Sequence, residues 1–304
     1  MSRSILKSSA LLGVSLSMLA IPSSWALDPN ESVQALIRKT KSNLVFVKGG
    51  TFKMGDFGPI TTPDRLPYTS QDESKPLHDV ELESFSIGKY KVTYEDFDVY
   101  SSDSGTPRIA ELRRDRPYRN IPNVPAGVNW QEAKNYCQWL GKVTNLPFDL
   151  PTEAQWEYAA RSGGKYHAWA TDSGKYEDGR NVASYEQRRD MMPGVSSPRV
   201  YPVGKFPPNP LGLYDMSSNG RDWVNDWFSR TYYEHSPLRN PQGPITGTEK
   251  VLRGIEGDYA TAVTMYRQKS PPKKEIRVID NMPTTDRHPD IGFRCALNSP
   301  TPIN

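Results

Sequence analysis

Glycine and proline interrupt this 304-residue sequence at about one position in six. Proline removes a backbone hydrogen-bond donor and glycine destabilises helix interiors, so a chain broken this often has little room for long helices. The remaining composition, with 36% hydrophobic and 24% charged residues, is typical of a globular protein that buries a substantial core. These features predict a loop-rich α+β protein with little regular secondary structure, rather than a helical bundle or a doubly wound sheet.

The first 26 residues have the organisation of a secretory signal peptide. Arg3 and Lys7 precede an apolar run that ends at Ile21, and small residues at positions 24 and 26 provide a cleavage site after Ala26. A membrane anchor is the alternative, but a spanning helix needs about 20 apolar residues and this run is shorter. We therefore expect an exported, periplasmic protein with no membrane span.

Two helices in the middle of the chain are predicted to begin with capping boxes, in which two side chains three positions apart bond each other's backbone. The capping pairs are Asn129 with Glu132 and Thr152 with Gln155, and the expected stops are Gly141 and Gly163-Gly164. In the first helix Cys137 shares an apolar face with Ala133 and Leu140. We therefore expect Cys137 to point into the core.

The start of the mature chain combines a short helix with β-rich runs. A helix is expected over residues 27–41, and an alternating pattern over residues 80–93 predicts a strand. Residues 44–56 form two β-rich runs broken at Gly49-Gly50, which is typical of a β-hairpin. Residues 57–78 are rich in Pro, Asp, Thr and Ser and are predicted to form a long surface loop.

Positive and negative charges are nearly balanced, with 38 Lys and Arg against 35 Asp and Glu. These charges are interspersed along the chain, whereas nucleic-acid-binding proteins usually carry a basic stripe. Nucleic acid is therefore not expected as a partner.

Six motifs in series resemble the formylglycine-generating-enzyme, or sulfatase-modifying-factor, family. The motifs are VKGGTFKMGD from position 47, KPLHDVELESFSIGKYKVTYEDF from 75, VNWQEAKNYCQWLGKVTNLPFDLPTEAQWEYAAR from 128, YPVGKFPPNPLGLYDM from 201, LRG from 252 and IGFRCA from 291. The resemblance implies a C-type-lectin-like mixed fold, with calcium ions supporting its loops. Together with the predicted signal peptide (1–26), this divides the chain into an N-terminal segment (27–43) and a single domain (44–304).

Active members of this family use copper(I) held by two cysteine thiolates, which lie shortly after the motif that reads LRG here. Copper(I) prefers soft sulfur ligands over oxygen donors. The corresponding segment, residues 251–269, contains no cysteine, and Tyr259 and Thr264 occupy roughly the two ligand positions. Copper is therefore not expected as a cofactor, and neither is formylglycine generation.

The chain contains only two cysteines, Cys137 and Cys295. An even cysteine count in an exported protein favours pairing, although two free buried thiols are an alternative. The resemblance implies that these two cysteines form a structural disulfide between the central helix and the IGFRCA strand.

The resemblance also implies calcium sites. At the first, Asp215 and Asp222 would supply carboxylate oxygens, while Ser218 and Gly220 would supply backbone carbonyls; a plain Asx-type turn is the alternative. A second calcium site would use the two residues Asn181 and Val182, but an expected acidic partner is missing from it.

Two functions are compatible with these sequence features and with the family resemblance. The first is a non-catalytic periplasmic protein that binds a protein partner; the specific role is an immunity protein that neutralises a toxin, such as a phospholipase effector of a type VI secretion system. The alternative is a periplasmic oxidoreductase similar to the pyoverdine-maturation protein. In that case the candidates for substrate contact or acid–base catalysis are Glu256, Asp258, Tyr259 and Arg267, for which ordinary loop structure is the competing explanation.

Overall fold

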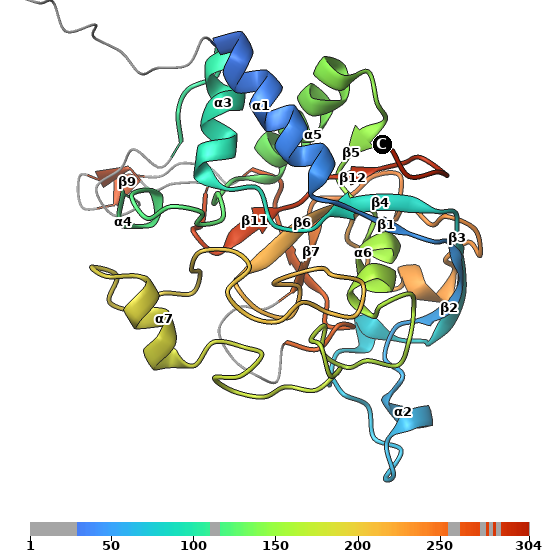
Figure 1. Cartoon of the computed structure of the whole chain (residues 1–304). Helices are drawn as coiled ribbons and strands as arrows, with labels where there is room; N and C mark the ends of the chain where they lie inside the picture. Colours follow the sequence, from blue (N-terminus) through green and yellow to red (C-terminus); the bar gives the residue numbers. More distant parts are fainter. Residues whose placement is uncertain are drawn as a thin grey trace, which may run out of the picture.

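The computed structural model describes residues 29–109, 116–254, 262–273, 278–279, 282–283 and 287–303. Within these ranges, short helices surround small β-sheets and long connecting segments join them (Figure 1). The loop-rich α+β class predicted from the sequence is confirmed. The predicted signal peptide, residues 1–26, lies outside the described residues.

The regular elements are short. The helices are α1 (Pro29–Ser42), α2 (Gly58–Thr61), α3 (Tyr94–Ser104), α4 (Arg116–Arg119), α5 (Trp130–Thr144), α6 (Glu153–Ala160) and α7 (Tyr185–Met191), with 3-10 turns η1 (Asp72–Ser74) and η2 (Tyr232–Glu234). The strands are β1 (Leu44–Val47), β2 (Gly50–Met54), β3 (His78–Leu82), β4 (Phe85–Gly88), β5 (Phe148–Asp149), β6 (Arg221–Trp227), β7 (Lys250–Gly254), β8 (Gln268–Ser270), β9 (Val278–Ile279), β10 (Met282–Pro283), β11 (Ile291–Phe293) and β12 (Ala296–Leu297). No helix in the described part of the chain is both long and apolar enough to cross a membrane.

Two four-stranded sheets form the centre of the molecule. One has the strand order β1-β4-β12-β5 and the other has the order β11-β6-β7-β8, in which β11 runs parallel to β6. The C-terminal segment contributes to both, because β11 belongs to the second sheet and β12, two residues later, belongs to the first. The last strands of the chain therefore join the two sheets.

The predicted capping boxes are present. Asn129 and Glu132 cap α5, and Thr152 and Gln155 cap α6 through reciprocal side-chain and backbone hydrogen bonds. The predicted stop at Gly141 is wrong, because α5 continues to Thr144 and ends at Asn145 in a left-handed conformation. Glycine is required at this interior position because the backbone oxygens of Leu146 and Phe148 lie close to it. A Cβ atom there would stand 3.0 Å from the oxygen of Leu146.

The predicted hairpin over residues 44–56 is also wrong. The two runs are strands, but β1 pairs with β4 and β2 pairs with β3. Gly49 lies at the break, where an added Cβ atom would stand 2.3 Å from the backbone oxygen of Leu82. The chain therefore changes sheets at Gly49-Gly50 rather than folding back on itself.

Two large apolar clusters hold these elements together. One joins α1, α3 and α5 and contains aromatic residues such as Phe97, Tyr136 and Phe293. The other packs α6 against β2 and β3 through Trp156, Phe52 and their neighbours. As predicted, Cys137 is buried on the inner face of α5, in the first of these clusters.

Candidate functional site

The C-terminal end of β7 is where the sequence placed the chemistry of this chain. Three of the four catalytic candidates, Glu256, Asp258 and Tyr259, lie outside the described residues. The fourth candidate, Arg267, and the position of Thr264 are described. These two residues show what lies beneath this end of the strand.

Arg267 is a buried residue that pairs with the start of α6. Its guanidinium group donates to both carboxylate oxygens of Glu153, at 2.7 and 2.9 Å. It also lies 4.2 Å from the centre of the Tyr233 ring. With its donors engaged in this way, Arg267 has the surroundings of a core residue rather than those of a substrate contact.

The same ion-pair network continues through Arg253 of the LRG motif. Arg253 donates to Glu153 and to Glu157, both at 2.8 Å, and Glu157 also accepts from Arg161 at 2.9 Å. Burial would raise the pKa of Glu153, but the adjacent guanidinium groups of Arg267 and Arg253 lower it. The network therefore keeps a buried carboxylate charged and ties β7 to α6.

Thr264, near one of the two positions that correspond to copper ligands, has a structural role. Its hydroxyl group donates to the backbone oxygen of His167 at 2.9 Å, and its own backbone oxygen accepts from Arg253. The side chain is buried, and it offers a hydroxyl group where copper(I) would need a thiolate.

One carboxyl group near this network titrates close to neutral pH. Burial, followed by the nearby charge of Glu153, raises the pKa of Asp226 to about 7. Its carboxylate accepts a 2.8 Å hydrogen bond from the backbone nitrogen of Glu153, at the start of α6. Because Asp226 is buried, this group has no direct access to a substrate at the surface.

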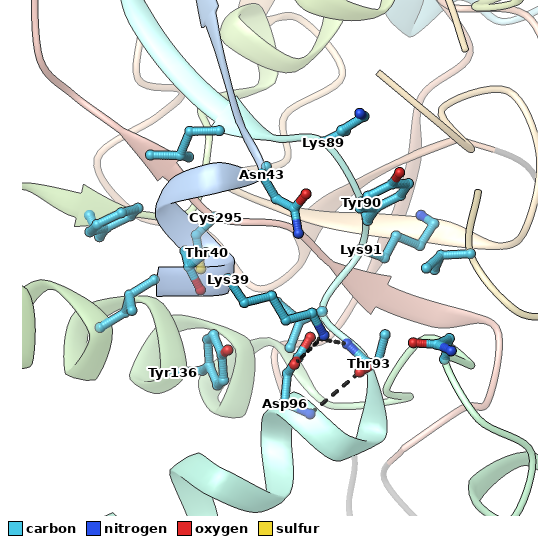
Figure 2. A pocket seen from close by; sticks show the side chains of 17 residues that line it. Lys39, Thr40, Asn43, Lys89, Tyr90, Lys91, Thr93, Asp96, Tyr136 and Cys295 are labelled. Atoms are coloured by element: carbon cyan, nitrogen blue, oxygen red, sulfur yellow. Dashed lines mark hydrogen bonds and ion pairs between the residues drawn. The ribbon is translucent and has the colours of Figure 1, made fainter. Parts of the chain in front are cut away.

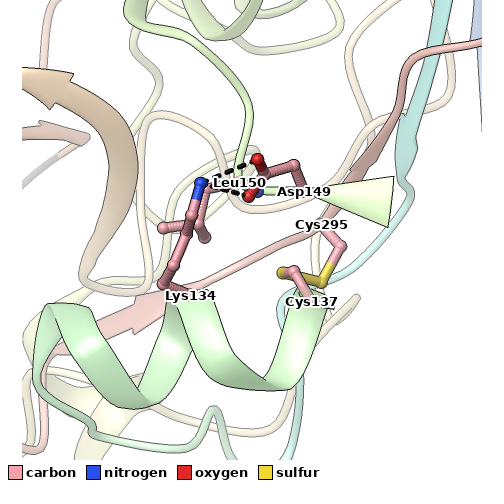
Figure 3. The surroundings of a disulfide bond; sticks show 5 residues. All are labelled: Lys134, Cys137, Asp149, Leu150 and Cys295. Carbon is pink, nitrogen blue, oxygen red and sulfur yellow. Dashed lines mark hydrogen bonds and ion pairs between the residues drawn. A yellow bond between two sulfur atoms is a disulfide. The ribbon is translucent and has the colours of Figure 1, made fainter. Parts of the chain in front are cut away.

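The two cysteines form a disulfide bond between Cys137 on α5 and Cys295, which lies between β11 and β12 (Figure 3). Their Cα atoms are 5.6 Å apart, and the bridge closes a sequence separation of 158 residues. Beside it, Lys134 on the same helix forms an ion pair with Asp149 at 2.7 Å. Both links attach α5 to the first sheet.

Asp222, a predicted calcium ligand, lies in β6 directly after the loop that holds the other predicted ligands. Lys91 donates to one carboxylate oxygen of Asp222 at 2.6 Å, while Arg294 and Trp156 donate to the other at 2.8 and 2.9 Å. All three partners are buried. Two protein cations therefore already neutralise this carboxylate, which argues against Asp222 as a ligand for a further cation.

The other proposed ligands in this loop differ in what surrounds them in the structure. Asp215 is buried and accepts from the backbone nitrogen of Gly204 at 2.9 Å; burial raises its pKa. Gly220 has a φ of 81°, and an added Cβ atom would lie 2.6 Å from the backbone oxygen of Asp290. Ser218 is buried close by. Calcium binding at this loop remains a prediction.

The second proposed calcium site consists of groups that are bonded to the protein. The amide of Asn181 accepts from the backbone nitrogen of Glu177 and donates to Asp172, and the carbonyl of Val182 accepts from Gly179. Among the described residues, no group of three or more His, Cys, Asp or Glu side chains could hold a metal ion.

Residues 57–69, within the predicted surface loop, form a projecting segment that carries the helix α2, which the sequence did not indicate. In Figure 1 this segment extends away from the sheets. Buried Asp56 holds its base, because its carboxylate accepts from the backbone nitrogens of Gly58, Tyr68 and Thr69 at 2.9, 3.1 and 2.9 Å. The only local signal is an aspartate after a strand, since the bonds to Tyr68 and Thr69 depend on how the loop returns.

Two aliphatic side chains are exposed on this segment. Ile60 is 59% exposed and Leu66 is 58% exposed. Tyr166 is also largely exposed and lies beside the segment, with its ring centre 5.2 Å from that of Phe57. Asp56 thus holds the base of this projecting segment, or protrusion, and Ile60 and Leu66 expose apolar side chains on its surface.

Comparisons with known proteins agree with the geometry. A family model described as "Sulfatase-modifying factor enzyme 1-like domain" matches residues 30–299. The formylglycine-generating enzyme of Streptomyces coelicolor is 31% identical over 299 residues, which cover 83% of this chain and 88% of that protein. The inactive C-alpha-formylglycine-generating enzyme 2 of Bos taurus is 26% identical over 317 residues, covering 86% of this chain and 89% of that protein.

A solved structure extends this similarity to three dimensions. The structure of PvdO from Pseudomonas aeruginosa matches with a TM-score of 0.63 and 28% sequence identity. The match covers 84% of this chain and 93% of that one.

Proposed function

The chain belongs to the sulfatase-modifying factor enzyme 1-like domain family, and we propose that it uses this scaffold as an exported, non-catalytic binding protein. The observation that carries the proposal is the cysteine inventory. The sequence contains two cysteines, and both form the Cys137–Cys295 disulfide. A copper(I) site of the thiolate type needs two free cysteines, so this chain lacks the ligands for that oxidation.

The projecting segment supports binding as the remaining role. Ile60 and Leu66 expose aliphatic surface, and apolar groups that stand clear of a protein body are favourable contacts for a partner. Because Asp56 fixes the base of the segment, binding would order little additional backbone. We infer that the partner is a protein whose surface receives this protrusion.

The specific role that we propose is immunity in the periplasm. The protein would neutralise an antibacterial effector, such as a phospholipase delivered by a type VI secretion system. The test is co-purification of the mature protein with an effector encoded beside its gene, together with rescue of cells that express this effector in the periplasm. Binding and rescue are expected; an effector that neither binds nor is neutralised would remove the immunity role.

Substitutions in the protrusion make the test specific. Ile60→Asp combined with Leu66→Asp should weaken effector binding by at least ten-fold and abolish rescue, because two charges replace apolar contacts. Ile245→Asp is the matched control, since Ile245 is 97% exposed elsewhere on the chain. All variants should keep the melting temperature of the wild type. Equal binding by the double variant and the control would exclude the protrusion as the docking surface.

A second candidate function is that of a periplasmic oxidoreductase similar to the pyoverdine-maturation protein. The similarity to PvdO favours keeping this alternative, although Arg267 is engaged with Glu153. Metal analysis of the purified protein separates the two functions. Stoichiometric iron or copper would favour the enzyme, whereas calcium or no metal would favour the binding protein.

A further inference from the structure

A pocket of about 230 Å³ lies beneath the C-terminal end of α1 (Figure 2). It is bounded by α1, by the segment between β4 and α3, and by α5. A cavity of about 150 Å³ is sufficient to admit benzene, so this space suits a small organic molecule.

The inner wall of the pocket is apolar. It is formed by Leu44, Val92, Leu140, Phe148, Val203 and Cys295. The disulfide and the aromatic cluster around α5 keep these side chains in place. The wall therefore fits the hydrocarbon part of a ligand.

Several polar side chains of the pocket can donate hydrogen bonds to a ligand. Tyr136 is only 2% exposed, yet its hydroxyl group has no hydrogen-bond partner among the described residues. Thr40 and Asn43, at the end of α1, also have side chains without such a partner in the described part of the chain. Tyr136 lines the pocket, so its hydroxyl group is available to donate to an acceptor on a ligand.

The charges of the lining also favour an acceptor. Asp96 is fully used, because one carboxylate oxygen accepts from Lys39 at 2.6 Å and the other from the backbone nitrogen of Thr93 at 3.4 Å. Buried Lys91 is paired with Asp222. Lys89, at the rim, has no carboxylate partner among the described residues. The lining thus has a surplus positive charge and no free carboxylate for a cationic ligand.

We propose that this pocket binds a small amphipathic carboxylate. The hydrocarbon part packs against Leu140, Phe148 and the disulfide. The carboxylate accepts hydrogen bonds from Tyr136, Thr40 and Asn43, with the positive charge of Lys89 at the rim. This site is separate from the protrusion and does not depend on the identity of the protein partner.

Three probes of equal chain length test the ligand class: hexanoate, 1-hexanol and hexylamine. Isothermal titration of the mature, disulfide-bonded protein should give saturable binding of hexanoate, at least five-fold weaker binding of hexanol, and no binding of hexylamine. Hexanol as tight as hexanoate would show that the apolar wall alone binds, and would overturn the proposal. Failure of hexanoate to bind would overturn it as well.

One conservative substitution tests the position of the carboxylate. Tyr136→Phe should weaken hexanoate binding about five-fold and leave hexanol binding unchanged, because only a donor is removed. Tyr100→Phe is the matched control, since its ring lies 5.5 Å from that of Tyr136 but Tyr100 does not line the pocket. Melting temperatures confirm that both variants fold. Unchanged hexanoate binding by Tyr136→Phe, or an equal loss in both variants, would contradict the proposed site.

Discussion

Asp222 shows how a single residue in this chain takes its role from distant partners. Its buried carboxylate joins Lys91, before α3, to Arg294, between β11 and β12. The sequence marks Asp222 as a polar residue in a loop that resembles a calcium site, but it does not show that two cations reach the same carboxylate. Such a pairing depends on the tertiary fold, and the local pattern around Lys91 contains no sign of it.

This arrangement predicts that Lys91→Met will be strongly destabilising. Removing one partner of a buried ion pair leaves charge without full compensation, which typically costs about 3 kcal/mol or more. The free energy of unfolding, measured by urea denaturation at pH 7, should fall by about that amount.

Lys53→Met is the matched control, because Lys53 forms an exposed ion pair with Asp79 at 2.9 Å. Exposed pairs contribute about 1 kcal/mol or less, so this control should change stability little. If both variants lose the same stability, Asp222 is not held by Lys91 in the way described.

At the level of elements, the sequence predicts helix caps correctly but does not predict which strands pair. The capping boxes of α5 and α6 were visible in the sequence because both partners lie within one turn. The break at Gly49-Gly50 was also visible, but the partner strands β3 and β4 could not be chosen from local residues. Strand pairing is decided by the whole sheet, which is why the hairpin prediction failed.

The disulfide between α5 and the C-terminal segment gives a prediction at this scale. Cross-linking residues 158 positions apart restricts the unfolded chain and contributes about 5 kcal/mol in the chain-entropy model. The double variant Cys137→Ala, Cys295→Ala should therefore unfold at clearly lower urea concentration than the oxidised wild type.

Reductant provides the control for this comparison. It should destabilise the wild type toward the level of the double variant, and it should leave the double variant unchanged. Equal stability of the oxidised wild type and the double variant would show that the bridge adds nothing to the fold.

For the whole molecule, the family resemblance predicts the fold but does not predict the candidate binding surfaces. The six motifs span most of the chain, and the family match over residues 30–299 agrees with them. The sequence predicts a surface loop over the projecting segment but not its bracing by Asp56. The pocket beneath α1 could not be predicted, because it is assembled from residues far apart in sequence. Because both cysteines are in one disulfide, the chain has no free cysteine pair to hold copper(I), and this favours the proposed non-catalytic function.

The most direct test of the central claim is an oxidation assay. The mature protein would be incubated with copper, oxygen and a cysteine-containing sulfatase peptide, and the peptide would be followed by mass spectrometry. The formylglycine-generating enzyme of Streptomyces coelicolor serves as the positive control. We predict that the peptide's cysteine stays unconverted, since both cysteines of this chain are in a disulfide. Conversion of that cysteine to formylglycine would contradict the account.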